Sequence, residues 1–253
     1  GAQPRYLSLG LIIEEGFPTA DLQRVTESIR RETKRAGASI VTGDTKVVDK
    51  GSGDGIYINT AGIGFVEPTV HVSPRNVRVG DAILVSGDIG RHGIAVMSVR
   101  EQLELESPIE SDVAALDRPV SSLIANGVEV HCLRDATRGG LATALVEIAE
   151  AAHVCLEIDE ARVPVRDDVR AVCEILGFDP LYVACEGRFV AFVPENQRDR
   201  TLELLRRDPL CSDARLIGTV SGTDAKGSVV CKTEIGGSRV LDLLSGEQLP
   251  RIC

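Results

Sequence analysis

VEVHCLRDATRGGLATALVEIAE, residues 128–150, contains a strand-like run, a glycine-rich turn and a helix-like run in direct succession. The β-branched and apolar side chains of residues 128–133 predict a strand, and the Ala- and Leu-rich residues that follow predict a helix over 140–152. A strand that leads through a short turn into a helix is typical of folds in which helices cover sheets. We therefore expect an α+β or α/β fold with mixed sheets.

The same alternation continues from Gly80 to Lys232. Hydrophobic periodicity predicts strands over residues 82–87, 128–133, 154–158, 181–184, 188–193, 214–220 and 227–232, and helices over residues 92–103, 112–126, 140–152, 166–176 and 195–207. These elements predict an α/β domain over residues 71–232. Residues 233–253 contain several Gly and Ser residues and favour a flexible tail.

A smaller domain is expected over residues 1–70. It would contain a strand over 5–13 and an amphipathic helix over 19–36, which Thr19 could cap. Two β-branched runs, 38–48 and 56–66, are separated by a Gly- and Asp-rich segment. This arrangement predicts a hairpin.

The composition excludes several classes of protein. The 253 residues carry a net charge of −10, and no stretch concentrates Lys or Arg as nucleic-acid binding requires. No run approaches the length of a membrane-spanning helix, and residues 1–20 lack the pattern of a secretion signal. The 7 cysteines lack the spacing of a zinc site or a disulfide framework. We expect a cytoplasmic protein without nucleic-acid or membrane partners.

Gly43-Asp44-Thr45-Lys46 follows the strand-like run ASIVT and would place a carboxylate and an ammonium group together at a strand end. This pair suits Mg–ATP, because Asp44 can hold the metal while Lys46 balances phosphate charge. Taken alone, the motif is more often an ordinary polar turn.

The octamer Arg134–Leu141 is a more specific candidate for a nucleotide site. Gly139 and Gly140 at a helix start let backbone N–H groups approach an anion, which the helix dipole also favours. Thr137 and Arg138 add hydrogen-bond donors, and Asp135 could place a metal or cap the helix. An ordinary capped helix is the alternative.

Two residues are candidates for acid–base chemistry. His92, in the Gly-rich loop of residues 86–93, could contact a phosphate or transfer a proton, although a single loop His more often does neither. Glu186, in ACEGR, lies between two apolar runs, where a fixed carboxylate could act as a general base. A surface turn formed by Glu186 and Arg188 is equally compatible with the local sequence.

Cys253 is the candidate nucleophile. Six of the cysteines lie in apolar or helical contexts, whereas Cys253 follows the Gly- and Ser-containing tail. A thiol on a flexible terminus can enter a partner's active site and then its own. An incidental terminal thiol is the alternative.

GDTK, a GxxGxHG-type loop, DATRGGL and CEGR occur in this order, and PRIC ends the sequence. In this combination the chain resembles the HypE family of hydrogenase maturation proteins, whose superfamily also contains aminoimidazole ribonucleotide synthetase and selenophosphate synthetase. The resemblance spans nearly the whole chain, and PRIC separates HypE from its relatives.

The resemblance implies a two-domain aminoimidazole ribonucleotide synthetase-like fold and an ATP-dependent carbamoyl dehydratase. The carbamoyltransferase HypF would load Cys253 with a carbamoyl group, and phosphorylation of the carbamoyl oxygen by ATP would allow dehydration to a thiocyanate. The HypC–HypD complex would then accept the cyanide for the iron of nickel-iron hydrogenase. A homodimer built from first domains is also implied.

Site roles follow from the same resemblance. Glu186 is the preferred base, His92 is held in reserve, and Cys253 carries the substrate. The residues that resemble contacts to Mg²⁺ and ATP are Asp44, Lys46, Asp135, Thr137, Arg138, Gly139 and Gly140, with Asp44 and Asp135 as metal ligands.

The front of the chain departs from the family pattern. HypE proteins have a Gly-rich segment, a TTDSF-like strand and an NDLA-type motif before the residues that match Gly1–Pro4. The resemblance therefore implies that an N-terminal segment is missing, which would impair ATP binding and dimerisation. Two alternatives remain: a selenophosphate synthetase-like enzyme, and a non-catalytic module that docks with maturation partners.

Overall fold

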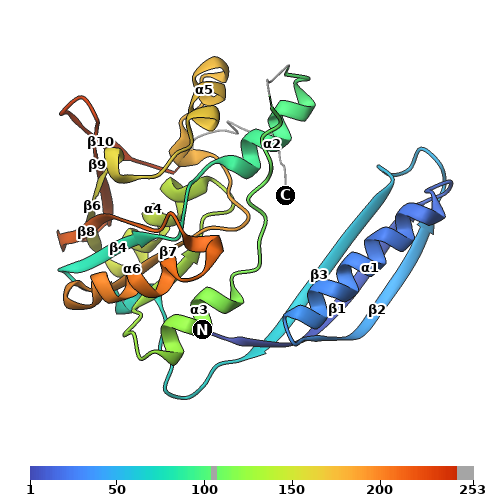
Figure 1. The fold of residues 1–253 in the computed structure, drawn as a ribbon, viewed down its shortest axis with the longest axis horizontal. Coiled ribbons are helices and arrows are strands. Elements are labelled where there is room, and N and C mark those ends of the chain that lie inside the picture. The colour runs from blue at the N-terminus through green and yellow to red at the C-terminus, as the bar shows by residue number, and fades with distance from the viewer. Residues whose placement is uncertain (104–106, 244–253) are drawn as a thin grey trace. The chain divides into compact units, whose positions relative to one another are not determined.

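The computed structural model describes residues 1–103 and 107–243. The chain forms two compact units: the first spans Gly1–Val70, and the second begins at His71. Figure 1 labels their helices and strands. In the described ranges, no helix is long and apolar enough to cross a membrane.

The first unit is a three-stranded sheet with one helix along it (Figure 1). Its elements are β1 (Gln3–Glu14), α1 (Thr19–Arg35), β2 (Ser39–Val48) and β3 (Ile56–Phe65). The strand order is β2-β1-β3, with β2 parallel and β3 antiparallel to β1. The predicted hairpin is therefore wrong, because the crossover through α1 places β2 and β3 on opposite edges of β1. Pro18, rather than Thr19, is the N-cap residue of α1, and no side chain caps it.

The two faces of this sheet differ. Leu11 and Ile13 of β1 are buried, whereas Tyr6 and Ile12 point to the other face and are exposed. This open face also carries Tyr57 and Ile63 of β3, which pair with Ile12 and Tyr6. A face with this much exposed apolar surface is typical of an interface.

The second unit is built on a mixed seven-stranded sheet in the order β10-β9-β6-β8-β4-β7-β5. Its strands are β4 (Asp81–Val85), β5 (Cys132–Asp135), β6 (Val154–Asp159), β7 (Phe189–Pro194), β8 (Arg215–Thr223), β9 (Ser228–Lys232) and β10 (Ser238–Leu241). Its helices are α2 (Arg91–Arg100), α3 (Asp117–Ala125), α4 (Gly140–Ala152), α5 (Asp167–Leu176) and α6 (Arg198–Arg206).

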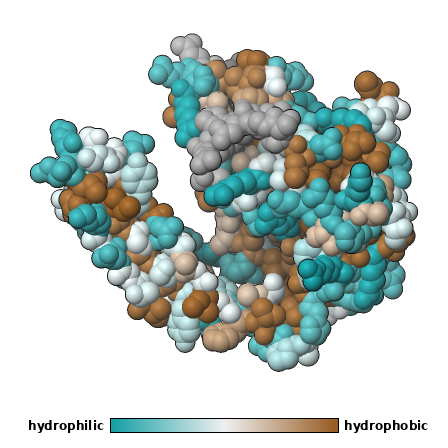
Figure 2. Space-filling model, turned by 180° about the vertical axis from the view of Figure 1, so that it is seen from behind, coloured by the Kyte–Doolittle hydropathy of each residue, from teal (hydrophilic) through white to brown (hydrophobic). Residues whose placement is uncertain are grey.

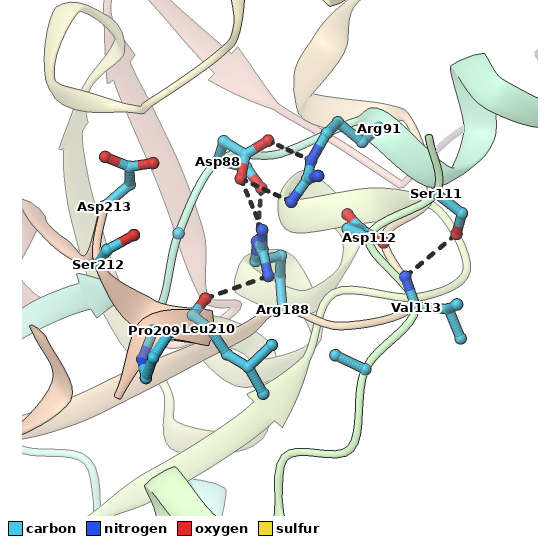
Figure 3. A pocket seen from close by; sticks show the side chains of 12 residues that line it. Asp88, Arg91, Ser111, Asp112, Val113, Arg188, Pro209, Leu210, Ser212 and Asp213 are labelled. Carbon is cyan, nitrogen blue, oxygen red and sulfur yellow. Dashed lines mark hydrogen bonds and ion pairs between the residues drawn. The ribbon is translucent and has the colours of Figure 1, made fainter. Parts of the chain in front are cut away.

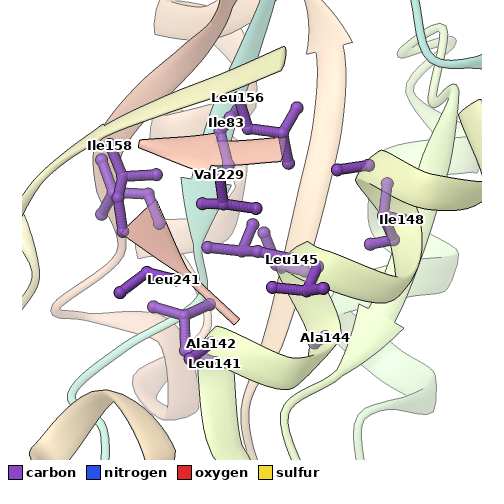
Figure 4. Packing of buried hydrophobic residues seen from close by; sticks show 14 of the residues in the cluster. Ile83, Leu141, Ala142, Ala144, Leu145, Ile148, Leu156, Ile158, Val229 and Leu241 are labelled. Atoms are coloured by element: carbon purple, nitrogen blue, oxygen red, sulfur yellow. The ribbon is translucent and has the colours of Figure 1, made fainter. Parts of the chain in front are cut away.

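Helices cover both faces of this sheet. In β4 every residue is buried: Ile83 and Val85 join the core beneath α4, and Ala82 and Leu84 join the core beneath α3 and α6. Figure 4 shows the α4 side of this packing, where Leu141 and Leu145 lie against sheet residues. A strand buried on both faces reads as a continuous apolar run, which explains the sequence AILV.

Four predicted elements in the second unit differ from the structure. The strand expected over 128–133 begins only at Cys132 and continues to Asp135 as β5. Residues 181–184 do not form a strand, because Pro180–Tyr182 is a 3-10 turn in which Asp179 accepts a hydrogen bond from the Leu181 N–H at 3.0 Å. The helix expected over 112–126 begins only at Asp117, which leaves residues 112–116 in a loop. The tail expected from residue 233 contains β10, which pairs with β9. Residues 244–253, including Cys253, lie outside the described residues.

Candidate functional site

Three motifs of the second unit converge at one end of its sheet. The Ala136 N–H donates to the Arg188 carbonyl, and the Cys185 N–H donates to the Ala136 carbonyl, each at 3.0 Å. The Ser86 hydroxyl accepts from the Phe189 N–H at 2.9 Å. Backbone hydrogen bonds therefore join the loop after β4, the loop after β5 and the segment before β7.

A buried ion pair joins two of these motifs. Arg188 Nη2 lies 2.6 Å from Asp88 Oδ1, with side-chain exposures of 5% and 8%. Arg188 Nε also donates to the Asp88 carbonyl at 2.9 Å, and Arg91 pairs with the same carboxylate at 2.6 Å (Figure 3). The surface turn considered for Arg188 is therefore wrong.

These charges line a cavity of about 230 Å³. In Figure 3, Asp112 and Ser111 lie on one side of Arg188, and Ser212 and Asp213 lie on the other. The walls thus present carboxylates, hydroxyls and guanidinium groups, so the cavity suits a small polar ligand.

His92 and Glu186 are both held near this cavity. His92 Nδ1 lies 2.9 Å from the Ser111 hydroxyl, and the Glu186 N–H donates to Asp112 Oδ1 at 2.8 Å. His92 Nε2 and Glu186 Oε1 are buried and have no hydrogen-bond partner in the part of the chain that the structure describes. Buried polar atoms without a partner are uncommon and are consistent with groups reserved for a substrate.

The start of α4 is shaped to receive an anion. Gly139 and Gly140 have φ values of +69° and +64°. A Cβ atom on Gly140 would lie 2.6 Å from the Leu181 carbonyl oxygen, so no larger residue fits without movement. Within residues 1–103 and 107–243, the N–H groups of Leu141 and Ala142 donate to no backbone carbonyl. They are the first-turn donors that bind anions in other helices.

The side chains around the start of α4 differ in whether they are free to bind a ligand. Arg138 is exposed and forms no ion pair with any described residue, so its guanidinium is available to a phosphate. The Thr137 hydroxyl donates to Asp135 Oδ2 at 2.7 Å. In the described part of the chain, Asp135 Oδ1 has an ion-pair partner only in Arg134 Nη1, at 3.8 Å, and it can accept a further ligand.

Asp44 and Lys46 belong to the first unit and lie inside β2, not at its end. The strand continues to Val48 because its backbone pairs with β1 throughout this region. Both residues are exposed and share the open face of the sheet, since they pair with Gly10 and Ile12. Among the described residues, no group of three or more His, Cys, Asp or Glu side chains could hold a metal.

Four of the described cysteines are poor nucleophiles. Burial raises the pKa of the Cys132 and Cys185 thiols to about 12. Burial also raises the pKa of Cys173 and Cys211 to about 11. At neutral pH these groups remain thiols, whereas the thiolate is the reactive form.

Comparison with known proteins places the chain in a family. Residues 1–66 match the N-terminal domain, and residues 78–231 the C-terminal domain, of AIR synthase related proteins. The two units therefore define a member of this two-domain class. The thiamine monophosphate kinase of Aquifex aeolicus shares the fold, with a TM-score of 0.69 at 19% identity over 94% of this chain and 75% of that chain.

The HypE proteins are much more similar. Carbamoyl dehydratase HypE of Azotobacter vinelandii is 50% identical over 100% of this chain and 74% of its own length. The HypE of Cupriavidus necator is also 50% identical, over 100% of this chain and 72% of its own length. A crystal structure of hydrogenase maturation protein HypE in complex with ATP matches with a TM-score of 0.94 at 44% identity, over 100% of this chain and 76% of that chain. The chain belongs to the HypE family of carbamoyl dehydratases.

Proposed function

We propose that this chain uses ATP to dehydrate an S-carbamoyl group on Cys253 to a thiocyanate. The main support is the convergence of Glu186, His92 and the Gly139-Gly140 helix start at one end of the second unit. This arrangement combines groups for proton transfer with an anion site, and both are needed when phosphoryl transfer precedes loss of a proton.

The chemistry balances without a further reactant. The carbamoyl oxygen attacks the terminal phosphorus of ATP, and ADP leaves. The C–O bond then breaks with release of phosphate, while both N–H protons are lost and the C–N bond becomes a nitrile. Glu186 accepts one proton from the nitrogen, the departing phosphate can take the other, and His92 is the reserve group for proton transfer.

Candidate residues for nucleotide binding occur in each unit. In the second unit, Arg138 and the N–H groups at the start of α4 would contact phosphates. In the first unit, Lys46 is a candidate for balancing phosphate charge. Asp44 and Asp135 offer exposed carboxylate oxygens, the ligands that Mg²⁺ prefers. A Mg²⁺ ion bound by either carboxylate would offset the negative charge of the triphosphate.

Partners follow from the relatives and from the chemistry. A HypE solved as a HypE–HypF complex is 42% identical, with a TM-score of 0.90 over 96% of this chain and 79% of that chain. We infer that a carbamoyltransferase of the HypF type loads Cys253 from carbamoyl phosphate, and that a HypC–HypD complex accepts the cyanide. The open apolar face of the first sheet would pair with a second copy. We place the reaction in the cytoplasm, where ATP is available.

The test is the intact mass of the full chain during incubation with HypF, carbamoyl phosphate and Mg–ATP. The proposal predicts addition of one carbamoyl group, followed by loss of one water from the same peptide, which mapping places at Cys253. Carbamoylation without dehydration would contradict catalysis by this chain and favour a docking role. Addition at another residue would contradict the role of Cys253.

A further inference from the structure

Asp112 is a buried carboxylate in the loop before α3. Its exposed fraction is 4%, and its Oδ1 accepts the hydrogen bond from the Glu186 N–H at 2.8 Å. Its Oδ2 is buried and has no hydrogen-bond partner among the residues that the structure describes. Burying a carboxylate oxygen that has no partner costs folding free energy. The position of Asp112 beside Glu186 is therefore not explained by stability alone.

The loop that carries Asp112 packs directly on the backbone next to Glu186. A Cβ atom on Gly187 would lie 1.9 Å from the Asp112 carbonyl oxygen and 2.9 Å from the Ala114 nitrogen. Only a glycine allows this approach without movement. The glycine in the CEGR motif therefore fixes the position of the loop relative to Glu186.

The preceding residue of the loop contacts the second acid–base candidate. The Ser111 hydroxyl lies 2.9 Å from His92 Nδ1 and accepts from the Val113 N–H at 3.1 Å. Two adjacent loop residues thus hold His92 and Glu186. Each of these side chains keeps one buried atom that has no hydrogen-bond partner among residues 1–103 and 107–243: His92 Nε2 and Glu186 Oε1.

We propose that Asp112 is a positioning residue for the dehydration step. Its Oδ1 fixes the backbone of Glu186 and thereby directs the Glu186 carboxylate toward the nitrogen of the carbamoyl group. Asp112 acts only through Glu186 and takes no part in loading of Cys253. This inference rests on the proposed role of Glu186 as the base.

The test separates the two half-reactions. The full chain is first carbamoylated with HypF, and the first-order rate of water loss after addition of Mg–ATP is then followed by intact mass. Asp112→Ala removes the acceptor for the Glu186 N–H, whereas Asp112→Asn keeps an oxygen at that place. Asp199→Ala is the matched control, because Asp199 of α6 has a side chain that is 87% exposed and does not line this cavity.

Misplacement of a catalytic group by about 1 Å lowers a rate about 100-fold, so a 10- to 100-fold loss is expected for Asp112→Ala. Asp112→Asn should recover most of the rate, Asp199→Ala should match the wild type, and carbamoylation should be unchanged in all three. Because Asp112 acts through Glu186, the Asp112→Ala/Glu186→Gln double variant should be no slower than Glu186→Gln alone.

Three outcomes would overturn the inference: wild-type dehydration by Asp112→Ala, equal losses in Asp112→Ala and Asp112→Asn, or additive losses in the double variant. Glu186→Gln reports separately on the role of the base. If Glu186→Gln dehydrates at the wild-type rate, the proposed base is wrong. If Glu186→Gln dehydrates slowly but Asp112→Ala dehydrates at the wild-type rate, the role of Glu186 stands and only the positioning role of Asp112 is wrong.

Discussion

Replacing Asp88 by alanine tests how strongly the buried ion pair stabilises the second unit. The substitution removes the carboxylate 2.6 Å from Arg188 Nη2 and leaves a guanidinium that is 5% exposed. Arg188 keeps hydrogen bonds to the carbonyl groups of Asp88, Gly187 and Leu210, but its charge loses its only buried counter-ion among the described residues. Breaking a buried pair in this way costs about 3–5 kcal/mol.

For a unit of this size, that loss lowers the melting temperature by roughly 6–20 °C. Scanning calorimetry of the full chain would measure the shift. Glu203→Ala is the control, because Glu203 and Arg207 form an exposed pair at 2.7 Å whose loss should cost about 1 kcal/mol or less. Asp88→Ala/Arg188→Met also removes the buried guanidinium and leaves Arg91, which is 19% exposed, without this carboxylate; it should recover part of the stability. If Asp88→Ala shifts the transition no more than Glu203→Ala, the reasoning about this pair is refuted.

Three further predictions concern other parts of the chain. Gly140→Ala should cost about 2 kcal/mol or more, since its φ is +64° and its Cβ would meet the Leu181 carbonyl; an unchanged urea midpoint would contradict this. The N–H groups of Gly51 and Gly55 lower the pKa of Glu14, so this carboxylate stabilises the fold above its unfolded pKa and the effect disappears as pH falls through the lower folded pKa. The melting temperature of Glu14→Gln should therefore lie below that of the wild type at pH 7 and converge with it in acid, and a constant difference would refute the assignment. Iodoacetamide at pH 8 should leave four cysteines unmodified in the native chain, as peptide mapping would show: Cys132, Cys173, Cys185 and Cys211.

Hydrophobic periodicity predicted most elements of the second unit, because the local sequence of each strand or helix favours the structure that it adopts. The buried run at residues 82–87 predicted β4, and the Ala-rich run at 140–152 predicted α4 with its observed bounds. The apolar run at 181–184 led to the wrong prediction of a strand, since Pro180 and the cap by Asp179 favour a 3-10 turn there. Strand order in the first unit depends on contacts between distant residues, which a single sequence does not report.

The candidate site likewise contains features that are visible in the local sequence and contacts between distant residues that are not. The motifs themselves predicted His92, Glu186 and the Gly139-Gly140 helix start as site residues, because glycines and charges next to strands are visible in a sequence. The roles of Asp88 and Asp112 were not visible. Asp88 contacts Arg188 at a separation of 100 residues, and Asp112 contacts Glu186 at a separation of 74 residues.

The central claim is that ATP activates the carbamoyl oxygen and that this oxygen leaves as phosphate. The most direct measurement uses a carbamoyl group labelled with a heavy oxygen isotope, loaded on Cys253 by HypF, and follows the label after addition of Mg–ATP. The account predicts one labelled oxygen in the inorganic phosphate for each thiocyanate formed. Label released into water, with unlabelled phosphate, would contradict it.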